Sequence, residues 1–519
     1  MRGSPSRRTI DAYATLILWV VVTLLAVWRA AFVLAGVDLD TDAYGHHTIA
    51  RQIVETPRAL GVHWVWLPLF HYVQAAFIAL FDLRLDGVRL ANVVLTAATP
   101  LSLYALLRAA RARQEAHVSK GRDAIPWDFT PFLAAVLVAL SPIAMQMGTT
   151  GQPEPAFTLL VLLTVALLVE RRFVGASLVL SVAVLVRYEA WAIPPAIVAS
   201  RLVERFLPAR ASEASAERDA SKGSLRWLWP VLLPIAVVVA WAAARRPVDG
   251  AWFWFLKGTR SFANDAQGAH ASLDRSAAAL LSDAFYYPIE IAHLCLGASL
   301  WLVPCGVPRL WRRQGARFVL PYLAILGFLS AVWIARGSLG LTRHFAVMVP
   351  IYATAAAHGV MAVASCLERV AATLRHRAHA TAIAIAACAG LGCFLMVDTA
   401  RTLDAWMIDW RDKSWLSWPD RREIAAYLAA APPHTRILCD EPTIEVLSGL
   451  DRRRFDRAFL GDDEPTRRRI DAAAASGDGV LIVTWRGKIP ALQRDYDVAL
   501  APNVEPGAPS LVVLRVAPR

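Results

Sequence analysis

Three aspartates and two histidines stand close together near the start of the chain. In DLDTDAYGHHTIARQIV, Asp38, Asp40 and Asp42 occupy alternate positions, and His46 and His47 follow. Alternate side chains of an extended segment share a face, so an Asp-x-Asp pair can hold a divalent cation or a sugar. A carboxylate can also take a proton from a hydroxyl nucleophile. The plainer interpretation is a solvated loop in which Asp42 caps the helix that follows.

Three later stretches place charges beside apolar runs. Glu154 stands between two prolines in GTTGQPEPAFTLL, where a carboxylate is costly unless it faces protein or a water-filled cavity. Arg187 and Glu189 interrupt the apolar stretch around LVRYEAW, where opposite charges often simply pair. Arg343 and His344 precede FAVMVP, and an arginine at the positive end of a helix suits a phosphate. Interface anchoring is the alternative for these last two.

The rest of the chain must place these residues in or beside a membrane. The 519 residues are 56% hydrophobic and 18% charged, against about 25% charged in soluble domains. Apolar runs of about 17–25 residues recur, long enough for a bilayer core of about 30 Å. The net charge of +12 comes from arginines in short loops between these runs, so nucleic-acid binding is excluded as an interpretation. The six cysteines form no CxxC motif. Their spacing therefore gives no sign of a zinc site or of a disulfide framework.

The apolar run at 65–81 decides the topology, because every later loop changes sides if it spans. If it does not span and the N-terminus is cytoplasmic, 23 Lys and Arg fall in cytoplasmic segments and only Arg51, Arg58 and Arg84 in the first outside loop, 37–87. The positive-inside rule therefore predicts an interfacial helix at 65–81, with His71, Gln74 and Pro68 fitting an outer-surface position. Eleven spans are then expected at 13–36, 88–107, 129–147, 154–169, 173–187, 190–206, 227–244, 284–306, 317–335, 345–366 and 379–398.

The character of the sequence changes after this membrane domain, which we place at 1–398. Residues 399–519 contain the helix-like PDRREIAAYLAAA and PTRRRIDAAAASG and the strand-like TRILCD, GVLIVTW and SLVVLRV. The expected fold class is therefore an all-α polytopic membrane domain with a small C-terminal α/β domain outside the membrane. The Ala/Ser-rich, charged stretch at about 207–226 reads as a flexible cytoplasmic linker.

With this topology the four polar stretches all fall on the outer side of the membrane, and we expect them to surround one outward-facing cavity. Carboxylates there can deprotonate a hydroxyl, and arginines can stabilise a phosphate leaving group. Nucleotide sugars are cytoplasmic, so an outward site needs a donor that the membrane delivers, and a polyprenyl phosphate sugar meets that need. The alternative function is a multi-pass transporter or flippase with intramembrane charges along its substrate path, although no inverted repeat is visible.

The sequence resembles the GT-C superfamily of polyprenyl-phosphate-dependent glycosyltransferases. It looks most like bacterial relatives of protein O-mannosyltransferases and of the lipid A aminoarabinose transferase. The order of several stretches carries the resemblance, over roughly 1–400 and more loosely beyond: DAYGHHTIARQI, WLPLFH, LDGVRLANVV, SPIAMQMGTTGQPEPAFTLL, LVRYEAW and TRHFAVMVPIY.

The resemblance implies a role for several of these residues. Asp42 occupies the position of the first-loop catalytic acid, Glu154 that of the second-loop carboxylate, and Arg343 that of the late-loop arginine on the donor phosphate. Two departures concern the auxiliary acid: Ala43 follows Asp42 where relatives have Glu, and Val65 replaces a Glu, so Asp40 could take over. The Trp-Trp-Asp motif of oligosaccharyltransferases is absent, which disfavours transfer of a preassembled glycan to Asn.

These observations lead us to expect an inverting glycosyltransferase in a bacterial inner membrane, with the N-terminus cytoplasmic. Its catalytic groups would be Asp42 as general base, Glu154 and Asp40, and Arg343, His344 and Arg187 would bind the donor phosphate. Substrate contacts are expected from His46, Glu189, Trp66 and His71. The expected partners are a polyprenyl phosphate sugar, a protein, lipid or glycan acceptor, and membrane lipids. The sequence identifies no cofactor with certainty, and it leaves open whether the enzyme needs a divalent cation, Mg²⁺ or Mn²⁺.

Overall fold

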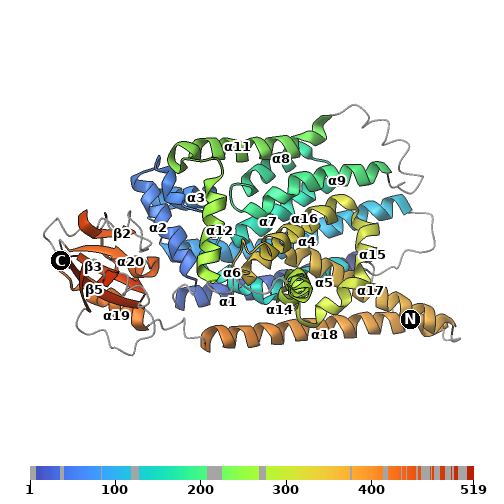
Figure 1. Cartoon of the computed structure of the whole chain (residues 1–519). Helices are drawn as coiled ribbons and strands as arrows, with labels where there is room; N and C mark the ends of the chain where they lie inside the picture. Colours follow the sequence, from blue (N-terminus) through green and yellow to red (C-terminus); the bar gives the residue numbers. More distant parts are fainter. Residues whose placement is uncertain are drawn as a thin grey trace.

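A computed structural model describes residues 7–518 except for 36–39, 83, 119–127, 207–224, 268–275, 374–376, 413–418, 434, 440, 452–453, 458–467, 469, 473–479, 486–491, 494–495 and 501–510. A helical part is followed by a small part with a sheet (Figure 1). The helical part consists of α1 (Arg7–Ala35), α2 (Thr41–Glu55), η1 (Leu60–His63), α3 (Leu69–Phe81), α4 (Leu85–Val118), α5 (Thr130–Leu140), α6 (Pro142–Thr149), α7 (Glu154–Val169), α8 (Phe173–Ala183), η2 (Tyr188–Ala192), α9 (Ile193–Phe206), η3 (Leu225–Leu228), α11 (Trp229–Asp249), α12 (Trp254–Gln267), α13 (Ala277–Phe285), η5 (Tyr286–Ile291), α14 (Ala292–Leu296), η6 (Gly297–Leu302), α15 (Val303–Gln314), α16 (Ala316–Ile334), η7 (Thr342–Met348), α17 (Val349–Thr373) and α18 (Arg377–Asp412).

Every predicted span coincides with a helix or a run of helices, but fewer than eleven reach the length of a full crossing. Among the described residues, seven helices are long and apolar enough, and α5 with α6, bent by 53°, would make an eighth. The runs at 154–169, 173–187 and 190–206 form α7, α8 and α9, of 16, 11 and 14 residues. At 1.5 Å per residue these helices are shorter than a bilayer core of about 30 Å. The same reasoning applies to α3, whose 13 residues fit the prediction that 65–81 does not span.

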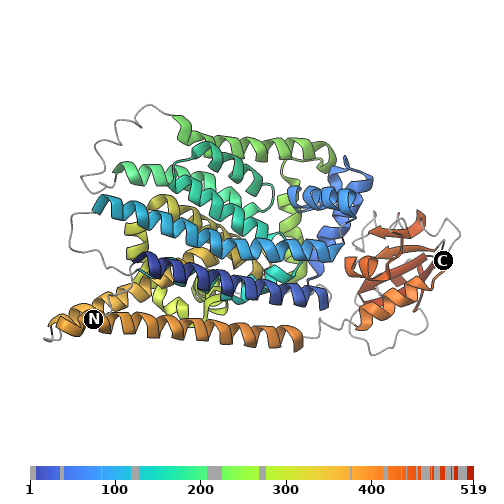
Figure 2. The same ribbon diagram turned by 180° about the vertical axis from the view of Figure 1, so that it is seen from behind.

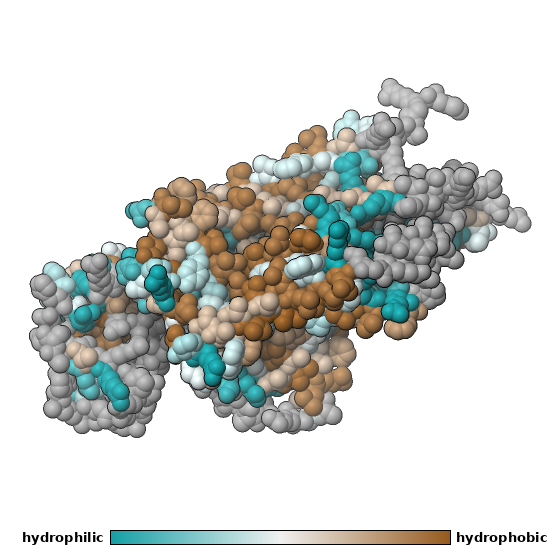
Figure 3. Space-filling model, turned by 90° about the horizontal axis from the view of Figure 1, so that it is seen from above, coloured by the Kyte–Doolittle hydropathy of each residue, from teal (hydrophilic) through white to brown (hydrophobic). Residues whose placement is uncertain are grey.

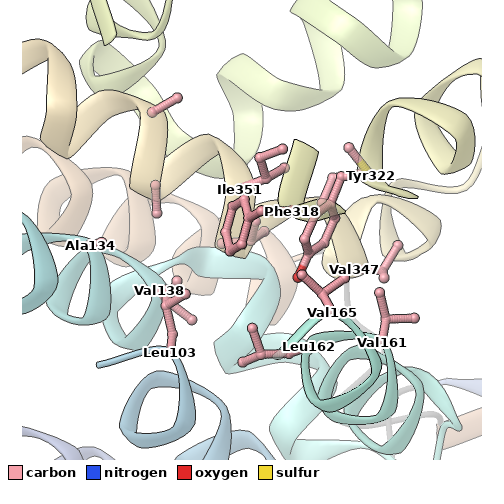
Figure 4. Packing of buried hydrophobic residues seen from close by; sticks show 14 of the residues in the cluster. Leu103, Ala134, Val138, Val161, Leu162, Val165, Phe318, Tyr322, Val347 and Ile351 are labelled. Carbon is pink, nitrogen blue, oxygen red and sulfur yellow. The ribbon is translucent and has the colours of Figure 1, made fainter. Parts of the chain in front are cut away.

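Much of the surface of the helical part is apolar. Large exposed hydrophobic side chains lie along α1, α3, α8, α11 and α18. The face of the helical part that Figure 3 shows is broadly brown. Exposed apolar area on this scale marks a membrane-facing surface. Inside, α4, α5, α7, α16, η7 and α17 interlock around Leu103, Val138, Val161, Phe318 and Val347, all buried (Figure 4). This core holds the ends of α7 and η7 that carry Glu154 and Arg343.

Helices α15 and α17 approach so closely at Gly306 that no side chain fits. A Cβ atom there would lie 1.7 Å from the carbonyl oxygen of Ala355 and 2.6 Å from the amide nitrogen of Gly359. We expect Gly306→Ala to force the helices apart and to destabilise the protein by about 1–3 kcal/mol or more, as overpacking does. The measurement is the thermal unfolding midpoint in detergent. Gly327→Ala on α16 is the control, because no atom of the described residues lies within 4 Å of a Cβ there, and equal midpoints for the two variants would contradict the prediction.

The small sheet domain lies at the same end of the helical bundle as α2 and α3, and α18 runs along the bundle towards it (Figures 1 and 2). Tyr44 of α2 and Leu85 of α4 pack with Val446 and Leu447, which belong to the sheet domain. The first loop and the C-terminal domain were both predicted outside, and their shared end agrees with that prediction. Which side of the membrane this end faces stays a prediction.

Labelling of single cysteines tests the orientation. The exposed Cys305, Cys366 and Cys393 are first replaced, and one cysteine is then introduced at position 61, 120 or 460. In intact cells an impermeant thiol reagent should reach positions 61 and 460 and leave 120 unlabelled, because the positive-inside rule places 120 in the cytoplasm. Labelling of 120 from outside would mean that 65–81 spans, and the proposed topology would be wrong.

The C-terminal domain has the predicted α/β character. It consists of α19 (Pro419–Ala429), β1 (Arg436–Cys439), α20 (Pro442–Ser448), β2 (Phe455–Arg457), β3 (Val480–Trp485), β4 (Tyr496–Leu500) and β5 (Leu511–Pro518). The strand order is β2-β1-β3-β5-β4, with the first three strands parallel and β5 antiparallel to its neighbours β3 and β4. The predicted boundary at 399 falls within α18. The predicted helix PTRRRIDAAAASG lies mostly outside the described residues, and α20, β2 and β4 were not predicted.

Candidate active site

The aspartate stretch begins helix α2. Asp40 has an extended backbone, and its Oδ1 accepts a hydrogen bond of 3.0 Å from the amide of Asp42. The N-cap is therefore Asp40 and not Asp42, because the helix begins at Thr41, two residues earlier than expected. Asp42 lies in the first turn, where its side chain is free to face another element. Asp38 lies outside the described residues.

Arg343 brings these two aspartates together with the carboxylate that opens α7. Its Nη1 donates to Oδ2 of Asp40 at 2.6 Å and its Nη2 donates to Oδ2 of Asp42. Its Nε lies 3.5 Å from Oε1 of Glu154, a salt-bridge distance. Asp40 and Arg343 are 303 residues apart in the chain, so the fold has assembled the first, second and last polar stretches at one place.

Arg187 extends the cluster from the other side of Glu154. Its Nη1 donates to Oε1 of Glu154 at 2.5 Å, and its Nη2 donates to Oε1 of Glu189 at 2.7 Å. The pairing of Arg187 with Glu189 is the plainer alternative from the sequence, and the structure adds Glu154 to it. The charges of Arg187 and Glu189 act on the imidazole of His344. Four carboxylates thus share two guanidinium groups.

The carboxylates differ in their access to solvent. The exposed fraction of the side chain is 36% for Asp42, 11% for Asp40 and 2% for Glu154. Burial raises the pKa of Asp42, but the charge of Arg343 and its hydrogen bond outweigh burial and hold the pKa below its ordinary value. Asp42 is therefore ionised at neutral pH and is the carboxylate of this cluster that a substrate can best reach.

Two polar residues of α4 fix the turn before Glu154. Neither was predicted to have a role. Arg89, fully buried, donates from Nε to the carbonyl of Thr149 at 2.8 Å. Asn92 donates to the carbonyls of Thr150 and Gln152, both at 2.7 Å. The signal was present in LDGVRLANVV, since an arginine and an asparagine inside an apolar span are costly without partners.

The loop from 60 to 66 is held from two sides. Arg245 of α11 donates to the carbonyls of Leu60 and Trp64, at 3.1 and 3.0 Å, and the hydroxyl of Tyr188 donates to the carbonyl of Val65. This places Trp66 over α2, where a Cβ at Gly45 would lie 2.9 Å from the indole.

Trp66, His46 and His71 lie together beside the cluster. The rings of Trp66 and His46 are 4.4 Å apart, and His46 is hydrogen bonded to His71. His71 and Gln74 are buried, because α3 packs this face against α2. Their predicted substrate contacts, like that of Glu189, remain predictions.

Within the described ranges, no group of three or more His, Cys, Asp and Glu side chains is arranged to hold a metal ion. Asp40, Asp42 and Glu154 face Arg343 instead. A divalent cation in this site stays a prediction without support from the geometry.

Fold and cluster together define a polytopic helical membrane protein with charged residues gathered at one end of the bundle and a small α/β domain beside them. The chain shares this fold with ArnT from Cupriavidus metallidurans. A structure of that protein bound to undecaprenyl phosphate is 16% identical, covers 95% of this chain and 97% of its own, and has a TM-score of 0.53. The corresponding apo structure is 14% identical, with coverages of 97% and 98% and a TM-score of 0.58. No protein family and no curated protein matches the sequence.

Proposed function

We propose that this protein is an inverting membrane glycosyltransferase that transfers a sugar from a polyprenyl phosphate to a hydroxyl acceptor. The observation that carries the proposal is the convergence of Asp42, Glu154 and Arg343 at one end of the bundle. This end is next to an apolar surface from which a lipid-linked donor can approach. The shared fold with a protein whose structure contains undecaprenyl phosphate supports the donor class.

In the proposed reaction, Asp42 takes the proton of the acceptor hydroxyl. The acceptor oxygen attacks the anomeric carbon as the bond to the phosphate oxygen breaks, and the electron pair leaves with the polyprenyl phosphate. Arg343, and Arg187 behind it, stabilise the charge on the departing phosphate. When the donor phosphate engages Arg343, Asp42 loses part of its ion pair and its pKa rises, so the carboxylate becomes a better base once the donor is bound.

A small apolar pocket lies beside the cluster, where the end of the donor lipid nearest the phosphate would enter. Val138, Ile143, Met147, Pro155 and Val349 are among the residues that line it. Pro155 directly follows Glu154, so an isoprenoid in this pocket would have its phosphate near the two arginines. The sugar, the acceptor and any need for Mg²⁺ or Mn²⁺ are open to direct assay.

The test uses the purified protein in detergent with a radiolabelled polyprenyl phosphate sugar and a membrane extract as acceptor. A glycosyltransferase should release polyprenyl phosphate and label an acceptor without a sealed compartment. If a screen of polyprenyl phosphate sugars gives no transfer, and sealed vesicles move the lipid-linked substrate instead, the transporter alternative holds.

A further inference from the structure

Three histidines form a continuous hydrogen-bonded chain inside the protein, starting one helical turn from Asp42. Nδ1 of His46 lies 2.7 Å from Nε2 of His71, and Nδ1 of His71 lies 2.9 Å from Nδ1 of His63. All three are buried, with exposed fractions of 5%, 0% and 0%. They come from α2, α3 and η1, so three separate segments supply one chain of imidazoles.

The proton count of this chain permits two arrangements. Three neutral imidazoles carry three ring protons, and two of these occupy the two hydrogen bonds. The third proton is on Nε2 of His46 or on Nε2 of His63, at opposite ends. A proton that arrives at His46 can therefore be balanced by a proton that leaves from His63, with one proton shifting in each hydrogen bond between them.

Both ends of the chain suit such a transfer. His46 follows Asp42 by four residues, so their side chains are neighbours on one face of α2, and a charge on His46 acts on Asp42. At the other end, Nε2 of His63 is buried and has no hydrogen-bond partner among the described residues. Gly61, two residues before His63 in the same short helix, is exposed, so the proton would leave to solvent past this helix.

The proposed reaction produces a proton that must leave. The donor is a phosphate diester with one negative charge, whereas the released phosphate monoester has a second pKa of about 6 and carries nearly two charges at pH 7. The acceptor hydroxyl has lost its proton to Asp42. One proton per turnover therefore remains on the protein, and Asp42 cannot act again until it has passed on.

We propose that His46, His71 and His63 relay this proton from Asp42 to the solvent side of the loop at 60–63. The proposal rests on the proposed function. The chain conducts the proton and does not store it: burial, and the nearby charge of Arg245, lower the pKa of His63 to about 3. Trp66 packs at a tilt against His46, and Trp241 meets His63 edge-on.

The test replaces the middle of the relay. His71→Ala should lower kcat by about 10²-fold, the scale of proton-transfer catalysis, and leave the KM of the donor unchanged. Added imidazole can occupy the vacated space and restore both hydrogen bonds. 1-Methylimidazole fills the same space but has one nitrogen blocked, so it cannot relay. We expect rescue of kcat by imidazole and not by 1-methylimidazole.

His47→Gln is the matched control, because His47 is equally buried on α2 and takes no part in the chain. It should transfer at the wild-type rate. Equal rescue by both compounds, no rescue by either, or an unchanged kcat in His71→Ala would overturn the relay. The relay alone fails if one of these results is found while wild type transfers sugar and Asp42→Asn does not. The proposed function fails if wild type itself transfers no sugar.

Discussion

Replacement of Asp42 by Asn is expected to lower sugar transfer by about 10²–10⁴-fold, the contribution of a well-placed general base. The amide keeps the shape of the side chain but cannot take the acceptor proton. The fold should survive, because the N-cap of α2 is Asp40 and remains in place. The measurement is kcat with a saturating polyprenyl phosphate sugar, together with the yield and unfolding midpoint of the purified variant.

The neighbouring aspartates are the controls for this prediction. Asp40→Asn should retain the cap, since Asn caps helices as well as Asp does, and should lose one charge beside Arg343. We expect an intermediate loss of activity for it and a mild effect for Asp38→Asn. Wild-type activity in Asp42→Asn would show that the aspartates only begin a helix and pair with Arg343, and the proposed mechanism would be wrong.

The general architecture could be predicted because it depends on local composition. Each apolar run formed a helix, and the strands beginning at Arg436, Val480 and Leu511 followed from short β-branched runs. The exact ends of two of these helices could not be predicted, because α8 ends at Ala183 instead of 187, and the short helix η2 precedes α9, which begins only at Ile193. The turn after Ala183 lies in the apolar run VAVLV and depends on packing in three dimensions, so it leaves no strong mark in the sequence.

The sequence was enough to predict which residues belong to the site, but not which of them contact one another. Charges beside apolar runs are costly, and this cost singled out Asp42, Glu154 and Arg343. Which carboxylate faces which guanidinium depends on how α2, α7 and η7 meet, and no local pattern records that. The supporting residues Arg89 and Arg245 bind backbone carbonyls of distant turns, so their roles became visible only in the folded chain.

Arg343 is expected to control use of the donor more than use of the acceptor. Its guanidinium is the group that Asp40, Asp42 and Glu154 share, so a phosphate bound at this position would compete with these carboxylates for it. Arg343→Lys keeps the charge but loses the planar fork, and kcat/KM for the donor should fall by about 10²–10³-fold, as when one donor to a developing oxyanion is removed. The acceptor KM should change little.

Arg336→Lys is the matched control, because Arg336 lies seven residues earlier at the same end of the bundle and pairs with Asp283 instead. It should keep wild-type kinetics. Unchanged donor kinetics in both Arg343→Lys and Arg343→Ala would remove Arg343 from the site.

The pH dependence of kcat/KM in Arg343→Ala is a second, independent test of the pairing between Arg343 and Asp42. Burial raises the pKa of Asp42, and Arg343 holds it below its ordinary value, so removal of Arg343 leaves burial opposed only by the weaker effects of His46 and His344 and should raise that pKa. Because Asp42 must be ionised to accept a proton, the acid limb of kcat/KM should move to higher pH in Arg343→Ala and move less in Arg343→Lys. If both variants keep the wild-type limb, the group that titrates in the free enzyme is not paired with Arg343, and the base would have to be sought elsewhere in the cluster.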